Sequence, residues 1–355
     1  MQKVVAKIHL GSIRRNAEAF SRLTKTKLCA VVKANAYGHG AEEVVGALQS
    51  VAHAFAVAIL DEGLAVRTAA CGKDILVLTP PVCEEEVFAL GANGFIASVP
   101  DLWTARLLCS VSEKYRLPMR VHLKINTGMN RYGMTAWELG RVCALLREKP
   151  FVLVEGIYSH LYTTDMQTAE TQRALFQDAV KIGRGYFPRL TAHLSATYGC
   201  LLGERFAFDM CRVGIGLYGY LPSEMPKSAL AVGKSLSLEK GMQVYAKTVV
   251  SRRYAFGGAG YGKPSVLLEK GERLSVCRCG YADGFLRKRE NGTAGADENI
   301  NNLCMDACIR ANGKKRGETV PVMTDADETA LAAGTISYEV LCAATRRAEF
   351  VYDED

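Results

Sequence analysis

The feature that most constrains the fold is an alternation of short apolar segments with longer amphipathic ones, repeated eight times between residues 28 and 219. The apolar segments are 28–32, 54–59, 74–79, 94–99, 119–125, 154–160, 190–195 and 212–218. Segments with helical periodicity lie between them, among them 41–49, 61–70, 100–115, 136–147 and 169–182. Buried strands that alternate with helices predict a parallel sheet, and eight such units predict an (α/β)8 barrel of the TIM type. A doubly wound open sheet is the alternative with the same periodicity.

The pattern changes after residue 221, where the proline-containing segment 222–228 predicts a linker. The predicted elements beyond it are strands at 242–254 and 265–268 and an exposed polar loop at 287–302. We therefore expect the barrel to occupy residues 8–225. A mainly-β C-terminal domain is expected to occupy 226–355 together with 1–7.

Composition argues against several classes of protein. The net charge of +7 comes from scattered basic residues, without the cluster that a nucleic-acid partner requires. No apolar run approaches the roughly 20 residues of a membrane span, and the N-terminus lacks the apolar core of a signal peptide, so we expect a cytoplasmic protein. The 12 cysteines lack the C-x-x-C spacing of zinc sites, so we expect reduced thiols and no metal.

Polar residues follow several of the predicted barrel strands. They are Lys33, Asn35, Tyr37 and His39 after the first strand, Lys124, Asn126, Thr127 and Arg131 at the fifth, His160 at the sixth, Thr197 after the seventh, and Arg212, Gly214 and Gly216 at the eighth. The carboxyl ends of barrel strands meet on one face, which carries the active site of such enzymes. Lysine, arginine and histidine gathered there predict a site for a small anionic ligand.

Lys33 follows directly after an apolar strand. An ammonium group in that position loses part of its hydration, which favours the neutral amine. Such an amine forms a Schiff base with an aldehyde, which is how pyridoxal phosphate is held by enzymes. Position alone favours the alternative, a lysine that extends to the surface.

The neighbouring residues favour the first interpretation. Residues 30–40, with the sequence AVVKANAYGHG, closely resemble the cofactor-lysine signature of the alanine racemases. Further resemblances follow in the family's order along essentially the whole chain. They are KINTGMNR at 124–131, EGIYSH at 155–160, RVGIGLYG at 212–219, GYADG at 280–284, CMD at 304–306 and YEV at 338–340.

The resemblance implies an N-terminal barrel, a C-terminal β domain and a homodimer that shares two active sites. It also implies pyridoxal 5'-phosphate as cofactor and interconversion of L-alanine and D-alanine, which supplies D-alanine for peptidoglycan. The catalytic bases would be Lys33 and, from the partner subunit, Tyr281; two bases on opposite faces are what racemisation requires. The cofactor would be bound by Lys33, Tyr37, His160, Thr197, Arg212, Gly214, Ile215 and Tyr338. Arg131 and Met305 would receive the substrate carboxylate, and Lys124 lies where some members carry a carbamylated lysine.

Some positions depart from the family pattern, and three rival functions accompany the main one. Asn126 replaces an aspartate, Asn130 a glycine and Ala196 an asparagine. These changes, with Asn301 and Asn302 before Cys304, bear on the entryway, the dimer contact and the substrate range. A serine or broader-specificity racemase of the same family is the nearest rival.

Two other kinds of protein are disfavoured by particular residues. A barrel amino-acid decarboxylase pairs the pyridine nitrogen with an acid, which Arg212 argues against. A non-catalytic cofactor carrier consists of a barrel alone, which the C-terminal domain with Tyr281 argues against. For His160, a structural role in the core and a role beside the cofactor ring are equally open.

Overall fold

The computed structural model describes residues 4–163, 165–222, 224–257, 261, 269–286, 303–310 and 313–354. The chain divides into two compact units. One, here called the barrel unit, comprises Ile13–Ala34 and Ala41–Glu239. The other, here called the β unit, comprises Met1–Ser12, Asn35–Gly40 and Lys240–Asp355. Each unit is described by itself.

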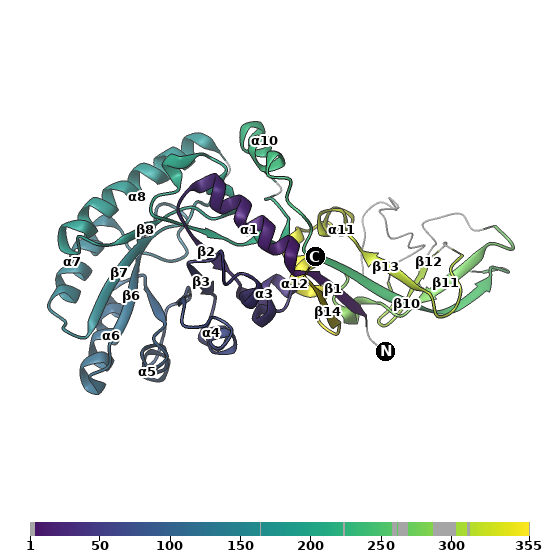
Figure 1. Cartoon of the computed structure of the whole chain (residues 1–355), viewed down its shortest axis with the longest axis horizontal. Coiled ribbons are helices and arrows are strands. Elements are labelled where there is room, and N and C mark those ends of the chain that lie inside the picture. The colour runs from purple at the N-terminus through teal and green to yellow at the C-terminus, as the bar shows by residue number, and fades with distance from the viewer. Residues whose placement is uncertain are drawn as a thin grey trace. The chain divides into compact units, whose positions relative to one another are not determined.

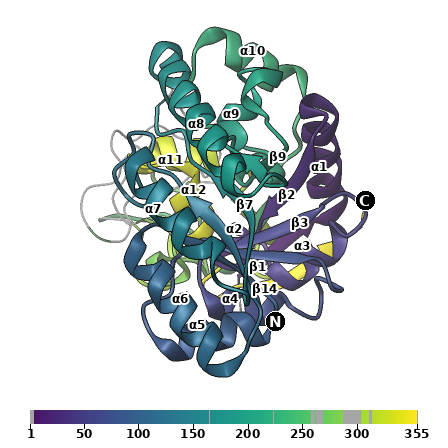
Figure 2. The same cartoon turned by 90° about the vertical axis from the view of Figure 1, so that its left-hand side faces the viewer.

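Eight parallel strands form the sheet of the barrel unit, in the order β8-β7-β6-β5-β4-β3-β2-β9. They are β2 (Lys27–Val31), β3 (Ala54–Val57), β4 (Asp74–Val77), β5 (Ile96–Val99), β6 (Met119–Lys124), β7 (Val152–Tyr158), β8 (Thr191–His193) and β9 (Met210–Val213). At the seam between β8 and β9, Asp209 N donates to Ala192 O and Arg212 N donates to Ser195 O. The sheet is therefore a nearly closed barrel, and the predicted (α/β)8 fold is confirmed (Figure 2).

Helices surround this sheet on the outside (Figure 2). They are α1 (Leu10–Thr24), α3 (Ala41–Ala47), α4 (Leu60–Val66), α5 (Glu84–Ala92), α6 (Leu102–Tyr115), α7 (Ala136–Arg147), α8 (Met166–Tyr186), α9 (Thr197–Cys200) and α10 (Lys227–Ser235). The short α2 (Lys33–Gly38) follows β2, and its last four residues are assigned to the β unit. Side-chain caps begin several of them: Asp101 accepts from Thr104 N before α6, and Asp165 accepts from Thr168 N before α8.

Two local predictions for the barrel were wrong. The eighth strand ends at Val213, and Ile215–Tyr218 forms the 3-10 helix η2 instead of continuing the strand. Gly214 has φ −114° and ψ −94°, outside the extended region, so the strand cannot pass through it. Lys227 and Ser228, predicted as linker, begin α10, whose buried Ala229 and Gly233 supply an apolar face.

Strand burial explains the parallel sheet. Every residue of β3 and of β5 is buried, as expected for strands covered on both faces.

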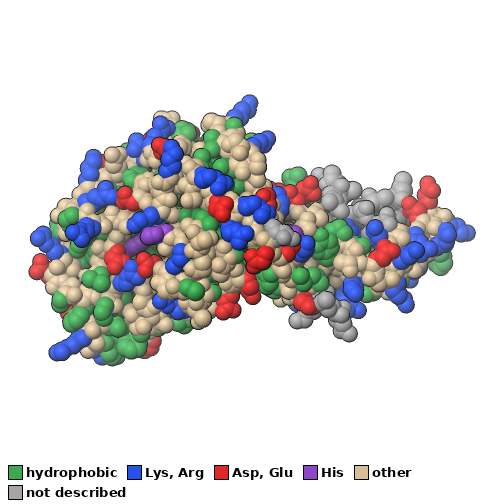
Figure 3. All heavy atoms as spheres, viewed as in Figure 1, with side chains coloured by type: hydrophobic (Ala, Val, Ile, Leu, Met, Phe, Trp, Pro, Cys, Tyr) green, Lys and Arg blue, Asp and Glu red, His purple; other side chains and the backbone are tan. Residues whose placement is uncertain are grey.

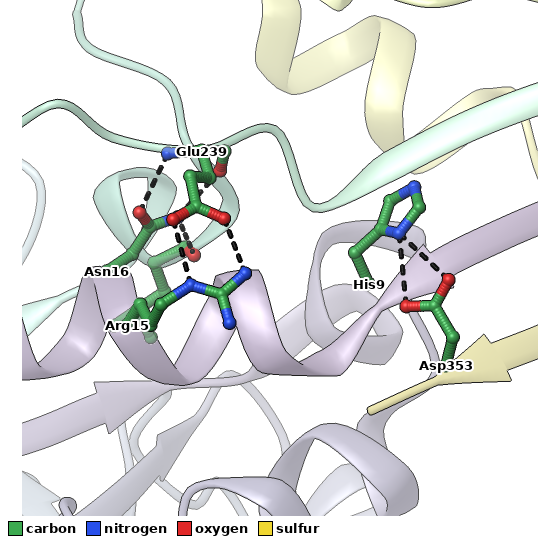
Figure 4. Close-up of polar contacts among 6 residues, drawn as sticks. His9, Arg15, Asn16, Glu239 and Asp353 are labelled. Atoms are coloured by element: carbon green, nitrogen blue, oxygen red, sulfur yellow. Dashed lines mark hydrogen bonds and ion pairs between the residues drawn. The ribbon is translucent and has the colours of Figure 1, made fainter. Parts of the chain in front are cut away.

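Hydrogen bonds attach α1 to a later part of the barrel unit. On α1, Asn16 Nδ2 donates to Leu217 O and to Glu239 O. Arg15 makes two hydrogen bonds with the Glu239 carboxylate, of 2.8 and 2.6 Å (Figure 4). These contacts attach α1 to the end of the barrel unit.

The β unit has a six-stranded sheet with the order β12-β11-β10-β1-β14, and β13 pairs with β10. The strands are β1 (Val5–His9), β10 (Met242–Arg253), β11 (Arg273–Cys277), β12 (Cys308–Arg310), β13 (Thr319–Met323) and β14 (Glu349–Asp353). The N-terminal β1 lies between β10 and β14, and its His9 contacts Asp353 on β14 (Figures 1 and 4). The predicted mainly-β character of the C-terminal part is confirmed.

Two helices of the β unit were not predicted, α11 (Ala326–Ala333) and α12 (Ser337–Ala343). The strand predicted at 265–268 and the loop predicted at 287–302 lie outside the described residues.

In the described part of the chain, no helix combines the length and the apolar character needed to cross a membrane. On the face in Figure 3, basic and acidic side chains are interspersed over the surface.

Candidate functional site

Lys33 follows β2 and begins a turn of unusual handedness. Ala34, Asn35, Ala36 and Tyr37 have φ values of 52–54°, so α2 is a left-handed turn. A left-handed conformation costs an L-residue roughly 1–2 kcal/mol, because Cβ approaches the following carbonyl. Backbone strain of this kind persists only where the surroundings enforce it, and it concentrates at functional sites. The sequence offered no signal for this turn, because three of the four residues are alanine or tyrosine, which rarely adopt positive φ.

His39 accounts for part of the stability of the turn. Its Nδ1 lies 3.0 Å from Ala36 O and 3.1 Å from Tyr37 O, so the proton on Nδ1 is shared between the two carbonyls. The side chain is fully buried, and burial lowers the pKa of His39 to about 4. The imidazole is therefore neutral near pH 7 and acts as a structural donor to the turn that follows Lys33.

Four basic side chains of the barrel unit lie near enough to His160 to influence its pKa. Burial lowers its pKa well below 6.5, and the charges of Arg212, Lys124, Arg131 and Lys33 lower it further. The structure thus brings together five of the residues that the sequence singled out. In the described part of the chain, no carboxylate forms an ion pair with Lys124, Arg131 or Arg212. The excess positive charge favours an anionic ligand.

Lys124, the last residue of β6, is buried among these cations. Burial lowers its pKa well below 10.5, and Arg212 and Arg131 lower it further. Its Nζ lies 4.5 Å from the centre of the Tyr158 ring. A lysine in this setting is stabilised as the neutral amine, which is a nucleophile.

Arg212, on β9, is buried and rigidly oriented. Its Nη1 donates to His193 O at 2.8 Å, and its Nη2 donates to Ser159 O at 2.6 Å and to Leu194 O at 3.1 Å. Nη1 also lies 2.9 Å from His193 Nδ1. We expected Arg212 at the start of its strand. It is instead the third of four residues in β9, because the strand begins at Met210 and ends at Val213.

Hydrogen bonding extends from Arg212 through two histidines inside the barrel. Guanidinium nitrogens only donate, so His193 Nδ1 must accept from Arg212 and the His193 proton must lie on Nε2. His193 Nε2 then donates to His122 Nδ1 at 2.9 Å. The His193 ring also stacks on Tyr158, with centroids 4.9 Å apart and an interplanar angle of 6°. Burial lowers the pKa of both histidines, that of His122 to about 3, so both are neutral.

Sequence reasoning missed the roles of these two histidines. Neither His193 nor His122 is among the residues that the sequence pattern indicates for the site. The available signal was a histidine on each of two barrel strands, β6 and β8, at positions that point inward. The small Gly156 on β7 makes room for His122, because a Cβ there would lie 2.6 Å from the imidazole.

The candidate phosphate-binding residues of the barrel unit lie at the start of two short helices. Thr197 begins α9 and is buried, and its Oγ1 accepts from Gly216 N at 3.1 Å. Gly214 precedes η2 and Ile215 is its first residue. A Cβ at Gly216 would lie 2.5 Å from the Phe20 ring and 2.9 Å from Thr197 Cγ2, so only glycine fits. Backbone N–H groups at the start of a helical turn lack partners within the turn and can bind an anion.

Arg131 is exposed and lies at the end of a loop shaped by two asparagines. Asn126 Nδ2 donates to Asn130 Oδ1 at 2.9 Å, and Asn126 Oδ1 accepts from Gly128 N and Asn130 N. Asn130 has φ 55°, a left-handed conformation that asparagine tolerates better than most residues. The two departures from the family pattern therefore contact each other and stabilise the loop that presents Arg131.

The remaining predicted residues belong to the β unit. Tyr37 and Tyr338 are in ring contact, with centroids 6.0 Å apart, and burial raises the pKa of Tyr338 to about 12. Tyr281 begins the 3-10 helix η3 (Tyr281–Asp283), and its backbone N donates to Cys304 O at 3.1 Å. Tyr281 and Met305 are both exposed, at 37% and 54% of their full surface. Their side chains are available to a ligand or a partner.

Within the described residues, no three histidine, cysteine, aspartate or glutamate side chains gather in a way that would hold a metal ion. A nearly closed barrel with a lysine on a strained turn, and a group of buried and exposed cations beside it, defines an enzyme site for a small anionic molecule.

Two family models identify the enzyme family to which the chain belongs. The model described as "Alanine racemase, N-terminal domain" matches residues 8–222, and the model described as "Alanine racemase, C-terminal domain" matches residues 242–352. The chain belongs to the alanine racemase family, and it is an isomerase.

Individual relatives agree with this assignment. An alanine racemase of Lactobacillus delbrueckii subsp. bulgaricus is 32% identical over 371 residues, covering 98% of this chain and 97% of the relative. One from Nostoc sp. is 30% identical and covers 96% and 93%. Among solved structures, alanine racemase of Clostridium difficile 630 has a TM-score of 0.88 at 26% identity, covering 99% and 96%. The biosynthetic alanine racemase of Pseudomonas aeruginosa has a TM-score of 0.84 at 28% identity, covering 99% and 100%.

Proposed function

We propose that the protein interconverts L-alanine and D-alanine with pyridoxal 5'-phosphate bound at Lys33, and that this reaction supplies D-alanine for peptidoglycan. The observation that carries the proposal is the group of four basic side chains, Lys33, Lys124, Arg131 and Arg212, which all lie near enough to His160 to lower its pKa. Both the cofactor phosphate and the substrate carboxylate are anions, and such a group favours them. The printed names of the relatives support alanine as the substrate.

The residues of the chain fit the cofactor. Lys33 follows the buried strand β2 and supplies the amine, and Thr197 with the backbone of Gly214 and Ile215 suits a phosphate. The other residues that we assign to cofactor binding are Tyr37, His160, Arg212 and Tyr338. When bound, pyridoxal phosphate withdraws electrons from the Cα–H bond of an amino acid and so makes that proton removable.

Two side chains would move the proton. We assign removal and return of the Cα proton on one face to the Lys33 amine, and on the other face to the Tyr281 hydroxyl of the partner subunit. Exchange between the two faces is what converts one enantiomer into the other. Tyr281 is exposed in the chain described here, as expected of a residue that serves another subunit.

Arg212 would tune the reaction by facing the pyridine nitrogen. Its guanidinium remains a charged donor, because its histidine partner accepts from it and no carboxylate of the described residues forms an ion pair with it. A pyridine nitrogen beside a guanidinium is not fully protonated, so electrons are withdrawn less strongly than beside an acid. This arrangement suits brief proton removal and return better than transamination or decarboxylation.

The substrate carboxylate would be bound by Arg131, with Met305 of the partner subunit beside it. We also propose that Lys124 reacts with carbon dioxide to form a carbamate and releases one proton to water, because burial and the neighbouring Arg212 and Arg131 favour its neutral amine. The carbamate would be an anion beside Arg131 and Arg212 and would offset their charge. Mass spectrometry under mild conditions would then find the mass of one carbon dioxide on the peptide that contains Lys124.

Serine is the second candidate substrate, because the loop before Arg131 carries the hydrogen-bonded pair Asn126 and Asn130. One experiment distinguishes the two candidate substrates. Racemisation of L-alanine and L-serine is measured side by side with added pyridoxal phosphate, and Lys33→Ala serves as the control. Fast alanine turnover that disappears in Lys33→Ala supports the proposal, faster serine turnover would make the enzyme a serine racemase, and activity that survives in the control would overturn the role of Lys33.

Three further assignments accompany this function. We propose that the chain acts as a homodimer with shared active sites in the cytoplasm, with no nucleic-acid partner. We propose residues 8–225 as the cofactor-binding barrel. Residues 226–355, with 1–7, would form the domain that completes the active site of the partner.

A further inference from the structure

Cys277 and Cys308 lie directly opposite each other in the β unit. They are Cα partners in the antiparallel pairing of β11 with β12. Residues in that relation have Cα atoms about 4.5–5.5 Å apart. A disulfide spans Cα separations of about 4.4–6.8 Å, so the backbone already has the spacing that a bond between the two sulfurs requires.

The two thiols also point toward each other and differ in acidity. They are hydrogen-bonded, which lowers the pKa of Cys277 and raises that of Cys308. The charge of the buried Arg310, also on β12, lowers the pKa of Cys277 further. A thiolate beside a thiol is the arrangement from which disulfides form, because the thiolate is the nucleophile.

Access to the pair comes through an edge of the sheet. Both side chains are at least 96% buried, but among the described residues β12 is the terminal strand of the sheet. Strands at the edge of a sheet open locally at a low free-energy cost compared with global unfolding. Such opening exposes Cys308 and its partner together.

We propose that Cys277 and Cys308 are a redox modification site, which a peroxide converts reversibly into a cross-strand disulfide. The Cys277 thiolate attacks one peroxide oxygen, the O–O bond breaks, and a sulfenic acid forms as the other oxygen leaves with a proton as water. The Cys308 sulfur then displaces the sulfenic hydroxyl, which leaves as a second water. The two thiols lose two electrons and two protons, and one hydrogen peroxide becomes two waters.

The disulfide would lie next to residues that the proposed function places in the active site. β11 leads into Tyr281, four residues after Cys277, and Met305 lies three residues before Cys308. Tyr281 N donates to Cys304 O, and Ala282 N donates to Met305 O, so the two segments are joined beyond the cysteine pair. Drawing the sulfurs to about 2.05 Å shifts this junction, and displacements of about 1 Å in an active site reduce rates by up to roughly 100-fold. This second part rests on the proposed function, whereas the disulfide itself does not.

Peptide mapping tests the disulfide directly. The full-length protein is treated with hydrogen peroxide, its remaining thiols are alkylated, and it is digested with trypsin without reduction. Arg278 separates Cys277, on peptide 274–278, from Cys279, on peptide 279–287, while Cys308 lies on peptide 290–310. The expected product is 274–278 linked to 290–310 in the majority of molecules, and dithiothreitol should release it.

Matched variants identify the partners. Cys304→Ser removes the other cysteine of peptide 290–310 and should leave the cross-link intact, as should Cys279→Ser. Cys308→Ser should abolish it. A cross-link that contains Cys279 or Cys304, or continued alkylation of both Cys277 and Cys308 after peroxide, would overturn the proposal.

Activity is then compared before and after oxidation in the wild type and in Cys308→Ser. A loss of at least a few-fold that dithiothreitol reverses, and that Cys308→Ser lacks, supports coupling to Tyr281. Formation of the mapped disulfide with unchanged activity would leave the modification site standing and reject that coupling. Absence of racemase activity in the reduced wild type would reject the proposed function without bearing on the disulfide.

Discussion

Arg212 illustrates how a single charged residue is made stable inside the barrel. Its described partners are three backbone carbonyls and the Nδ1 of a neutral histidine, without a carboxylate. Carbonyls satisfy the donors of a guanidinium without cancelling its charge. Arg212 therefore remains available to an anionic or electron-rich ligand, which a salt bridge would prevent.

Replacing His193 tests this arrangement. His193→Phe keeps a ring to stack on Tyr158 but removes the acceptor for Arg212 Nη1, which costs about 1–3 kcal/mol of stability. We expect kcat to fall roughly tenfold, since a 1.4 kcal/mol loss of transition-state stabilisation has that effect. His193→Asn, whose side-chain oxygen can accept the same bond, should restore part of the activity. Equal kcat values in the wild type and His193→Phe would show that the histidine does not orient Arg212.

At the scale of the element, the left-handed turn after Lys33 is the least expected feature. Four consecutive non-glycine residues adopt positive φ. The local sequence disfavours this conformation, so its energy comes from contacts made by residues outside the four. Ala34 N donates to Glu62 Oε1 at 2.7 Å, and His39 donates to the carbonyls of Ala36 and Tyr37. The turn is therefore stabilised by one contact from the distant Glu62 and by two from the neighbouring His39.

Removing the imidazole donor should destabilise the turn. His39→Phe retains bulk but leaves two buried carbonyls without that donor, so we expect a loss of about 1–3 kcal/mol in stability. Pyridoxal phosphate should bind more weakly, because Lys33 and Tyr37 lie at either end of the turn. Absorbance titration measures the affinity, and His53→Ala, at an exposed histidine, is the control. Unchanged cofactor affinity in His39→Phe would mean that the turn is stabilised without His39.

At the scale of the molecule, the assigned site residues are divided between two compact units. Lys33, Lys124, Arg131, His160 and Arg212 belong to the barrel unit, and Tyr37, Tyr281, Met305 and Tyr338 belong to the β unit. A barrel with its own β unit is compatible with an active site completed by a second copy. The assignment of Tyr281 to the partner subunit depends on such a dimer.

Complementation tests the shared site. Lys33→Ala and Tyr281→Ala should each be inactive alone, but a mixture that is allowed to exchange subunits should regain activity. If dimers form at random, half are mixed and each mixed dimer has one intact site of two, so recovery should approach roughly a quarter of the wild type. Size-exclusion chromatography checks that dimers form. A mixture that stays inactive despite proven subunit exchange would mean that Lys33 and Tyr281 of one chain serve the same site.

Buried histidines should make the stability of the protein fall in mild acid. His39 and His122 have pKa values lowered to about 4 and about 3 by burial, whereas an unfolded histidine titrates near 6.5. Between these values the unfolded state binds more protons, so stability is fully present above about pH 6.5 and falls as the pH drops toward 4. The slope approaches roughly 1.4 kcal/mol per pH unit for each histidine. Thermal unfolding midpoints measured between pH 7 and pH 4 follow this loss of stability. In His39→Phe the midpoint should fall less steeply with pH than in the wild type. An equal dependence on pH in the two proteins would contradict the role of His39 in the acid sensitivity.

The sequence by itself determined the alternation of strands and helices and most of the basic residues of the candidate site, whereas the choice of the barrel over the open sheet needed the contacts between β8 and β9. Eight apolar segments alternating with helices leave few ways to bury the strands, and polar residues at strand ends must gather on one face. Lys33, Lys124, Arg131, His160 and Arg212 were accordingly predictable. Helices α11 and α12 were missed because short helices carry too little periodicity to be recognised.

Only the tertiary structure decided how those residues are held. The Arg212–His193–His122 chain and the Ala34–Glu62 contact of the left-handed turn join residues far apart in the sequence. The end of β9 at Val213 was also visible only in the structure. The facing of Cys277 and Cys308 likewise depends on the register of two strands separated by 30 residues. Local propensities are too weak to specify such contacts, because their energies arise from burial and from partners supplied by the whole fold.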